Sequence, residues 1–139
     1  LEFYTAEVGK SLEMPYFEDG VSAGFPSPAT DYLDAKLDLN DLLVEHPSAT
    51  YYVRVIGDSM IGAGIVSGDL LVVDESLEVS NNCIVVAYLD GEFTVKRIKK
   101  TKTKMFLNAE NDNYKPIEIT KDMDFVVFGV VAHSIHHFV

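Results

Sequence analysis

Residues 84–98 read Ile-Val-Val-Ala-Tyr-Leu-Asp-Gly-Glu-Phe-Thr-Val-Lys-Arg-Ile, and the fold class can be inferred outward from them. Two runs rich in β-branched and aromatic residues, Ile84 to Leu89 and Phe93 to Ile98, flank the dipeptide Asp90-Gly91. Asp-Gly is a strong signal for a two-residue turn, because both central positions of a type I′ turn need a positive φ. The stretch predicts an antiparallel β-hairpin.

Short strand patterns continue on both sides of this hairpin. They are separated by turn residues and recur about every eight to twelve residues, which is typical of an antiparallel barrel or sandwich. The further predicted strands are Thr50 to Ile56, Leu70 to Val73, Lys104 to Leu107, Pro116 to Ile119 and Phe125 to His133. We therefore expect a mainly β fold.

One short helix and an extended arm are expected before these strands. Three leucines after Asp38 have helical spacing, Asp38 can act as the N-cap, and Pro47 ends the helical pattern. Residues 1–29 are acidic and interrupted by Gly and Pro, which indicates an extended arm. We divide the chain into an N-terminal arm with the short helix (residues 1–45) and a β-domain (residues 46–139).

The composition excludes several classes of protein. The chain has 139 residues, 47% of them hydrophobic, which suits one compact domain. No stretch approaches the roughly 20 apolar residues of a membrane-spanning helix, and the first residues do not resemble a secretory signal. The one cysteine, Cys83, cannot form an internal disulfide, which fits a reducing compartment. We expect a cytoplasmic protein that does not enter the membrane.

The charge is unevenly distributed along the chain. The net charge is −11, and residues 1–45 carry ten acidic side chains against two lysines, a net charge of −8. Six of the eleven basic residues lie between Lys96 and Lys104. An acidic protein is a poor candidate for binding a phosphate backbone. The basic run is either a charged edge strand that resists aggregation or a docking surface.

The tetrapeptide Gly57-Asp58-Ser59-Met60 follows the predicted strand that ends at Ile56. A serine in a bend after a strand can present its hydroxyl with backbone amides nearby, as a nucleophile requires. The same residues also form common turns in which Asp or Ser bonds its own backbone. The motif alone leaves both interpretations open.

Lys96 is a second candidate for catalysis. In the strand after Asp90-Gly91, alternation places Thr94 and Lys96 on one face. A lysine that acts as a general base near neutral pH needs a pKa about three units below its ordinary value of about 10.4, equivalent to about 4 kcal/mol. Burial can supply this shift, whereas an exposed strand face cannot. Lys96 is therefore either a solvated side chain or a base beneath a covering segment.

Residues 21–29, Val-Ser-Ala-Gly-Phe-Pro-Ser-Pro-Ala, are a candidate for such a covering segment. The Ala23-Gly24 bond joins two small residues within an extended stretch, which a protease cleft can bind like a β-strand. The alternative is a flexible linker rich in Pro and Gly.

Together these motifs resemble the self-cleaving Ser-Lys proteases of the LexA/UmuD family. The resemblance combines Gly57 to Met60, a Phe93 to Lys96 strand whose lysine lies 37 residues after the serine, and the upstream Ala23-Gly24 bond. It extends from about residue 15 to about residue 133. Four further segments look like the UmuD branch of the family, namely residues 24–29, 46–50, 91–96 and 127–131.

The resemblance implies a fold and a set of site residues. The implied fold is the mainly β LexA/signal-peptidase-like barrel or sandwich. By similarity Ser59 is the nucleophile, Lys96 is the general base and Ala23-Gly24 is the scissile bond. Asp58 and Met60 belong to the nucleophile loop, whose backbone amides would stabilise the oxyanion. Neither a metal nor another cofactor is implied.

The resemblance also implies partners. The chain would form a homodimer, respond to a RecA filament on single-stranded DNA, and after cleavage join a UmuC-type translesion polymerase in the SOS response. Met14, Pro15, Tyr16 and Phe17 resemble the arm segment through which such proteins contact the sliding clamp, with aromatic packing as the alternative. We expect no direct DNA binding, because the segment before Gly24 is short and acidic.

Two other functions remain open from the sequence. One is a dimeric polymerase- or clamp-binding module without catalysis, and the other is a prophage-type repressor regulatory domain. His133, His136 and His137 lack an accompanying cluster of Cys or carboxylates, so we expect a frayed strand there rather than a metal site.

Overall fold

The structure is a computed structural model that describes residues 1–16, 23–24 and 36–139. The chain forms two compact units, the larger made of residues 1–7 and 46–139 and the smaller of residues 8–45. Each unit has its own sheet. In the described ranges, no helix is long and apolar enough to cross a bilayer.

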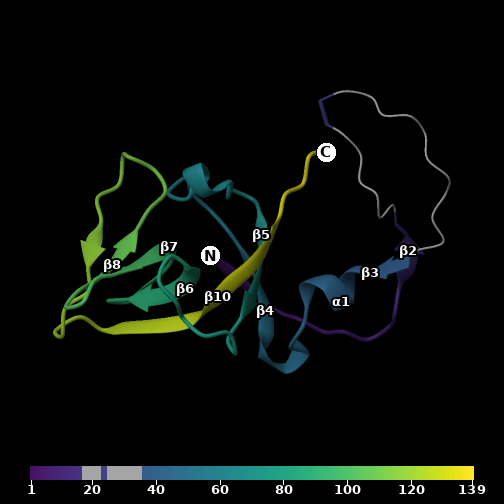
Figure 1. The fold of residues 1–139 in the computed structure, drawn as a ribbon, viewed down its shortest axis with the longest axis horizontal. Coiled ribbons are helices and arrows are strands. Elements are labelled where there is room, and N and C mark those ends of the chain that lie inside the picture. The colour runs from purple at the N-terminus through teal and green to yellow at the C-terminus, as the bar shows by residue number, and fades with distance from the viewer. Residues whose placement is uncertain (17–22, 25–35) are drawn as a thin grey trace. The chain divides into compact units, whose positions relative to one another are not determined.

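The larger unit is built on an antiparallel sheet of eight strands in the order β1-β4-β5-β10-β6-β7-β8-β9 (Figure 1). The strands are β1 (Glu2–Thr5), β4 (Thr50–Arg54), β5 (Leu70–Asp74), β6 (Ile84–Leu89), β7 (Glu92–Lys100), β8 (Met105–Asn108), β9 (Ile117–Glu118) and β10 (Phe125–Ile135). Two short 3-10 helices, η1 (Pro47–Ala49) and η2 (Ile61–Ala63), flank β4 in sequence. The prediction of a mainly β fold is confirmed.

Strands β6 and β7 form the predicted hairpin. Their register pairs Ile84 with Arg97 and Leu89 with Glu92. The turn residues Asp90 and Gly91 have φ values of 46° and 94°, the positive values that a type I′ turn requires. The turn therefore sets the register of the strand that carries Lys96.

The long strand β10 joins the two halves of the sheet. It pairs with β6 from Phe125 to Val130 and with β5 from Val130 to Ile135. The register shifts between Val127 and Gly129 on one side and between Val131 and His133 on the other. Such irregularities bend a strand and increase its twist, which lets one strand pair with partners on both sides of a curved sheet.

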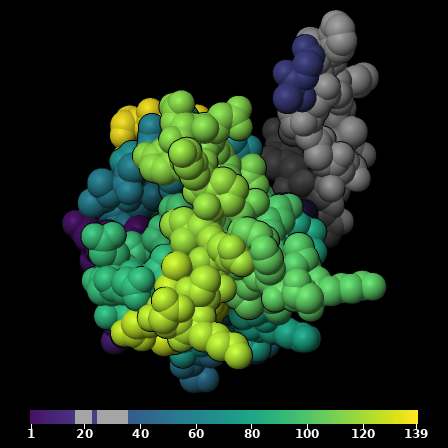
Figure 2. Space-filling model, turned by 90° about the vertical axis from the view of Figure 1, so that its left-hand side faces the viewer, coloured from purple at the N-terminus to yellow at the C-terminus, as the bar shows by residue number. Residues whose placement is uncertain are grey.

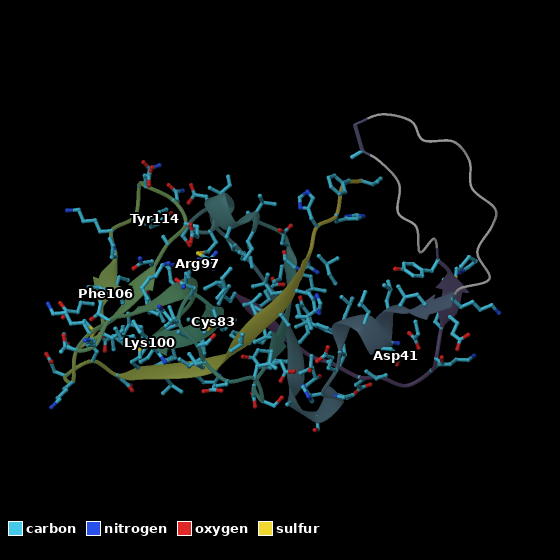
Figure 3. The ribbon with its side chains drawn as sticks, viewed as in Figure 1. Asp41, Cys83, Arg97, Lys100, Phe106 and Tyr114 are labelled. Carbon is cyan, nitrogen blue, oxygen red and sulfur yellow. The ribbon has the colours of Figure 1, made fainter. Side chains whose placement is uncertain are left out.

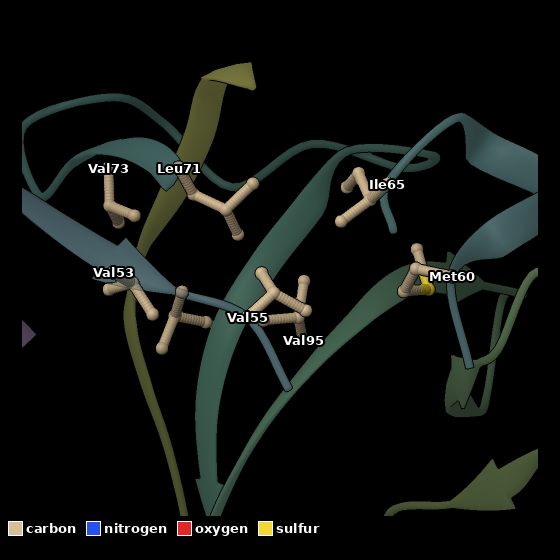
Figure 4. Close-up of a cluster of buried hydrophobic side chains, with 8 residues drawn as sticks. Val53, Val55, Met60, Ile65, Leu71, Val73 and Val95 are labelled. Atoms are coloured by element: carbon tan, nitrogen blue, oxygen red, sulfur yellow. The ribbon is translucent and has the colours of Figure 1, made fainter. Parts of the chain in front are cut away.

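Strand β6 buries side chains on both of its faces. Val86 belongs to one cluster of buried residues, here called the Val86 cluster, whose other members are Val53, Val55, Met60, Ile65, Leu71, Val73 and Val95 (Figure 4). Val85 and Ala87 point to the other side and pack with Ile98, Leu107 and Val130. Half-buried Cys83 packs against this second cluster, as expected for a small apolar side chain.

The first strand was not predicted. The sequence indicated an extended arm over residues 1–29, whereas Glu2–Thr5 pairs along β4, with Phe3 opposite Val53. Phe3 also contacts the ring of Phe93 at 4.9 Å between centroids. These partners are remote in sequence, so the local pattern of residues 1–7 contains no sign of them.

The interpretation of the basic run as an edge strand is wrong. Lys96, Arg97, Lys99 and Lys100 lie on β7, which is hydrogen-bonded to β6 on one side and to β8 on the other. Figure 2 shows the face where this green part of the chain reaches the surface. From Arg97 to Lys100 the strand has a partner on each side, which removes the edge there, and buried Val95 and Ile98 hold the strand in the core.

In the smaller unit, β2 (Glu13–Pro15) pairs with β3 (Lys36–Asp38), and the helix α1 (Leu39–Leu43) follows directly. The predicted N-cap is confirmed, because Asp38 accepts a hydrogen bond from the Asn40 amide at 3.0 Å. Ser11 Oγ also donates to Asp38 at 3.1 Å. The helix ends four residues before Pro47, so Pro47 begins η1 instead of stopping α1.

Burial in the Val86 cluster predicts that shortening two valines on neighbouring strands has very different effects on the free energy of unfolding. Val86 on β6 is 0% exposed and Val126 on β10 is 48% exposed. We expect Val86→Ala to lower the free energy of unfolding by about 2 kcal/mol, since it removes buried methyl groups and leaves a cavity. Val126→Ala should change it by less than about 0.5 kcal/mol. Urea titrations measure both, and equal losses would contradict the assigned core.

Candidate active site

The segment Gly57 to Met60 lies in the loop that leaves β4. Gly57 turns with a φ of +110°, a conformation that favours glycine, and its amide donates to Ser67 Oγ at 3.2 Å. Met60 is only 2% exposed and packs in the Val86 cluster (Figure 4). Half-buried Ser59 is thus held between a glycine turn and a buried anchor.

Lys96 lies within hydrogen-bond distance of this serine. The distance from Lys96 Nζ to Ser59 Oγ is 3.1 Å. Nζ also donates to Thr94 Oγ1 at 2.6 Å and to the Val95 carbonyl at 3.2 Å. Thr94 and Lys96 therefore share a face of β7, as alternation predicted. The fold brings together two residues that are 37 positions apart in sequence.

The surroundings of Lys96 disfavour its charged form. Burial lowers the pKa of Lys96, because an ammonium group loses hydration when it leaves water. Within residues 1–16, 23–24 and 36–139, no carboxylate forms an ion pair with Lys96. In this part of the chain, the ammonium form of Lys96 is therefore not stabilised by an ion pair. The amine is more easily neutral than an exposed lysine, and only the neutral amine can accept a proton.

A small cavity of about 100 Å³ lies beside the serine. Its walls include Ser59, Thr94, Phe93, Ile56 and Leu1, the residue that precedes β1. Most of the lining residues have apolar side chains, but polar atoms make up the larger part of the surface that faces the cavity. The space beside Ser59 suits a small or extended group rather than a bulky one.

The backbone around Ser59 offers free hydrogen-bond donors. Among the residues that the structure describes, the amide N–H groups of Asp58, Ser59 and Met60 donate to no other group. The Asp58 side chain accepts a hydrogen bond from the Tyr114 hydroxyl at 2.5 Å, and its carbonyl accepts one from Asn111 Nδ2 at 3.0 Å. Asp58 is therefore tied to a neighbouring loop.

Several contacts of the site were missed by the sequence reasoning. The hydrogen bond from Lys96 to Thr94 was not predicted, although alternation had already placed both side chains on the same face. Asn111 and Tyr114 carry no such signal, since they contact Asp58 across more than 50 residues of sequence. Their role depends on the path of the loop between β8 and β9.

The other predicted site residues lie elsewhere in the chain. Ala23 and Gly24 are exposed and belong to the smaller unit, and the rest of the predicted covering segment, residues 21–29, lies outside the described residues. In the predicted clamp-binding segment, Met14 and Tyr16 are exposed, whereas Phe17 is outside the described residues.

One of the three C-terminal histidines, His136, takes part in a different contact. His136 Nδ1 lies 2.5 Å from buried Asp69, so the end of the chain is attached to the sheet beyond Ile135. In the described part of the chain, no group of three or more His, Cys, Asp or Glu could hold a metal ion.

Comparisons with known proteins add an independent line of evidence. Residues 15–132 match the family model described as Peptidase S24-like. The chain is 43% identical over 126 residues to Protein ImpA of Salmonella typhimurium, covering 91% of this chain and 86% of ImpA. It is 41% identical over 134 residues to Protein MucA of Escherichia coli, covering 96% of this chain and 91% of MucA.

A third relative is LexA repressor 1 of Pseudomonas syringae pv. tomato, 42% identical over 111 residues. This match covers 79% of the present chain and 54% of the repressor, so the chain spans about half the length of that relative. The matches confirm the resemblance to the LexA/UmuD family that the motifs indicated. Both Ser59 and Lys96 lie within the matched residues.

The burial of Lys96 predicts a direct titration result. We expect the Lys96 amine, followed by NMR of ¹³C-labelled lysine, to titrate below the ordinary value of about 10.4. Because burial and not the serine hydroxyl is the cause, Ser59→Ala should leave the midpoint low. Since the folded-state pKa is the lower one, stability should rise with pH between the folded and unfolded pKa values. A midpoint at or above about 10.4 would contradict the burial of the amine.

Proposed function

Because the chain belongs to the Peptidase S24-like family, we propose that it is a self-cleaving serine protease with a Ser59-Lys96 dyad. The bond that it cuts is Ala23-Gly24 in its own N-terminal segment. Residues 46–139 carry the dyad, and the preceding 45 residues carry the scissile bond. The observation that carries the proposal is the 3.1 Å contact between Lys96 Nζ and Ser59 Oγ, within the range that proton transfer needs.

The reaction begins with a neutral Lys96 amine. Lys96 Nζ removes the proton from Ser59 Oγ, which attacks the carbonyl carbon of Ala23. The resulting ammonium then protonates the Gly24 nitrogen as the peptide bond breaks, leaving Ala23 as an ester on Ser59. A water molecule, deprotonated by the same amine, hydrolyses the ester and regenerates the serine.

The oxyanion of the tetrahedral intermediate needs hydrogen-bond donors that are already in place. The unengaged amides of Asp58, Ser59 and Met60 support this role. Thr94 Oγ1 and the Val95 carbonyl keep the amine oriented through their contacts with Nζ. When the cleavage segment covers Lys96, it excludes further water and lowers the pKa of the amine in the same direction as the existing burial.

The substrate is part of the same polypeptide, which explains how a small cavity can suffice. Tethering raises the local concentration of the scissile bond, so tight binding by a deep pocket is not required. Exposed Ala23 and Gly24 are small enough to approach the serine in an extended conformation. An effector would act by favouring the conformation in which the segment is docked.

The family resemblance supports a wider role in the SOS response. In this proposal a RecA filament on single-stranded DNA stimulates cleavage, and the protein acts as a homodimer. The processed form is an accessory subunit of a UmuC-type translesion polymerase in the cytoplasm. Exposed Met14 and Tyr16 are available for a sliding-clamp contact.

The proposal predicts a specific fragment. Purified protein at mildly alkaline pH should release a product that begins at Gly24, identified by intact-mass spectrometry. Ser59→Ala and Lys96→Ala should each lower the cleavage rate by at least about 100-fold, because each removes one half of the proton-transfer pair.

Lys99→Ala is the matched control, since Lys99 lies on the same strand but bonds to Asn82 Oδ1. It should cleave at the parental rate. Cleavage by both dyad variants at the parental rate would exclude the proposed dyad. A parent that stays uncut at every pH but still forms dimers would favour the non-catalytic binding module.

A further inference from the structure

The loop between β8 and β9 is attached to the nucleophile loop by several hydrogen bonds. The amide of Glu110 donates to the Ser59 carbonyl at 2.8 Å, and the amide of Gly62 donates to the Glu110 carbonyl at 2.7 Å. Asn111 and Tyr114 bond to the carbonyl and the carboxylate of Asp58. The position of Ser59 therefore depends on where this second loop lies.

Glu110 also connects this loop to the strand of the lysine. Its carboxylate forms an ion pair and hydrogen bond with Arg97 Nε, and Arg97 is the residue next to Lys96 on β7. Arg97 Nη1 donates to the Asn82 carbonyl at 2.6 Å. The guanidinium group is therefore bonded to both Glu110 and Asn82. Figure 3 shows Arg97 on β7 and Tyr114 on the loop beyond β8.

The two loops approach each other too closely for a side chain between them. A Cβ added to Gly62 would lie 2.6 Å from the Glu110 carbonyl oxygen. Glycine at position 62, three residues after Ser59, therefore allows its amide to reach the Glu110 carbonyl. This close packing transmits a displacement of Glu110 directly to the segment from Ser59 to Gly62.

We infer that Glu110 is a positioning residue, which holds the Ser59 loop against the strand of Lys96 by its ion pair with Arg97 and its two backbone hydrogen bonds. This inference rests on the proposed function for its catalytic consequence. Glu110 does not touch the reacting atoms. It sets the distance between Ser59 Oγ and Lys96 Nζ by joining the two elements that carry them.

The partly buried location of the pair distinguishes it from an ordinary surface contact. The side chains of Arg97 and Glu110 are 24% and 32% exposed. The ion pair of Lys104 with Glu118, also in this sheet, has side chains that are 56% and 43% exposed. Exposed pairs contribute little to stability, and among the described residues Glu118 forms no hydrogen bond or ion pair with the Ser59 loop. Glu118→Gln is therefore a matched control for Glu110→Gln.

The first test measures self-cleavage. Glu110→Gln removes the charge with little change in size, and we expect it to lower the cleavage rate about tenfold or more, because small misplacements of reacting groups are costly. Glu118→Gln should cleave at the parental rate. Arg97→Gln should slow cleavage as Glu110→Gln does, and the double variant should be no slower than the slower single variant, as for two residues of one contact.

The second test does not depend on cleavage. In a Ser59→Ala background the chain stays whole, and amide hydrogen exchange is measured at Glu110 and Gly62, whose N–H groups make the bonds between the loops. We expect exchange at both amides to be about tenfold faster in Glu110→Gln than in Glu118→Gln. Circular dichroism at the same temperature verifies that each variant remains folded.

The outcomes separate this inference from the proposed function. Parental cleavage and unchanged exchange in Glu110→Gln, or additive effects of the Arg97 and Glu110 variants, would overturn the positioning role. A parent that fails to cleave would overturn the proposed function, and the exchange rates would then decide alone whether Glu110 holds the loop.

Discussion

The contact between Lys96 and Ser59 is the interaction on which the rest of this site depends. A lysine amine placed 3.1 Å from a serine hydroxyl is chemically useful only when it is neutral. The structure favours the neutral form through burial, without a carboxylate partner in the described part of the chain. A carboxylate beside the amine would stabilise the ammonium and remove the base. Catalysis by this pair therefore requires an apolar, uncharged surrounding.

The sheet supplies that surrounding by the way it places β7. Lys96 pairs with Val85 of β6, and β8 pairs with the four residues that follow it, Arg97 to Lys100. The neighbouring Val95 and Ile98 are buried on opposite faces of β7, which holds this part of the strand in the core. The type I′ turn at Asp90-Gly91 fixes the register of this strand, and Met60 anchors the nucleophile loop in the Val86 cluster. The distance between the two functional side chains thus follows from core packing as much as from their own hydrogen bonds.

Local features were predictable from the sequence. The Asp90-Gly91 turn, the Asp38 cap and the bend at Gly57 depend on the conformational preferences of a few adjacent residues. The common face of Thr94 and Lys96 follows from strand alternation. Each of these predictions needed only a short segment, and the LexA/UmuD resemblance then linked Ser59 to Lys96.

Features that depend on long-range pairing were not predictable in the same way. Strand β1 forms because β4 offers an unpaired edge, and nothing in Glu2 to Thr5 indicates this partner. One of the two interpretations of the basic run, an edge strand, was suggested by charges that are visible in the sequence, whereas the hydrogen bonds of β7 to β8 are not. The contact of Glu110 with Ser59 likewise depends on the path of a loop.

The most direct measurement compares two titrations of the same amine. The self-cleavage rate is recorded against pH, and the pKa of Lys96 is measured independently by NMR in the Ser59→Ala variant. We expect a rate that rises with pH and levels off, with a midpoint that matches the Lys96 pKa and lies below about 10.4. A rate that is independent of pH, or whose midpoint differs from the Lys96 pKa by more than about one unit, would contradict the neutral amine as the base.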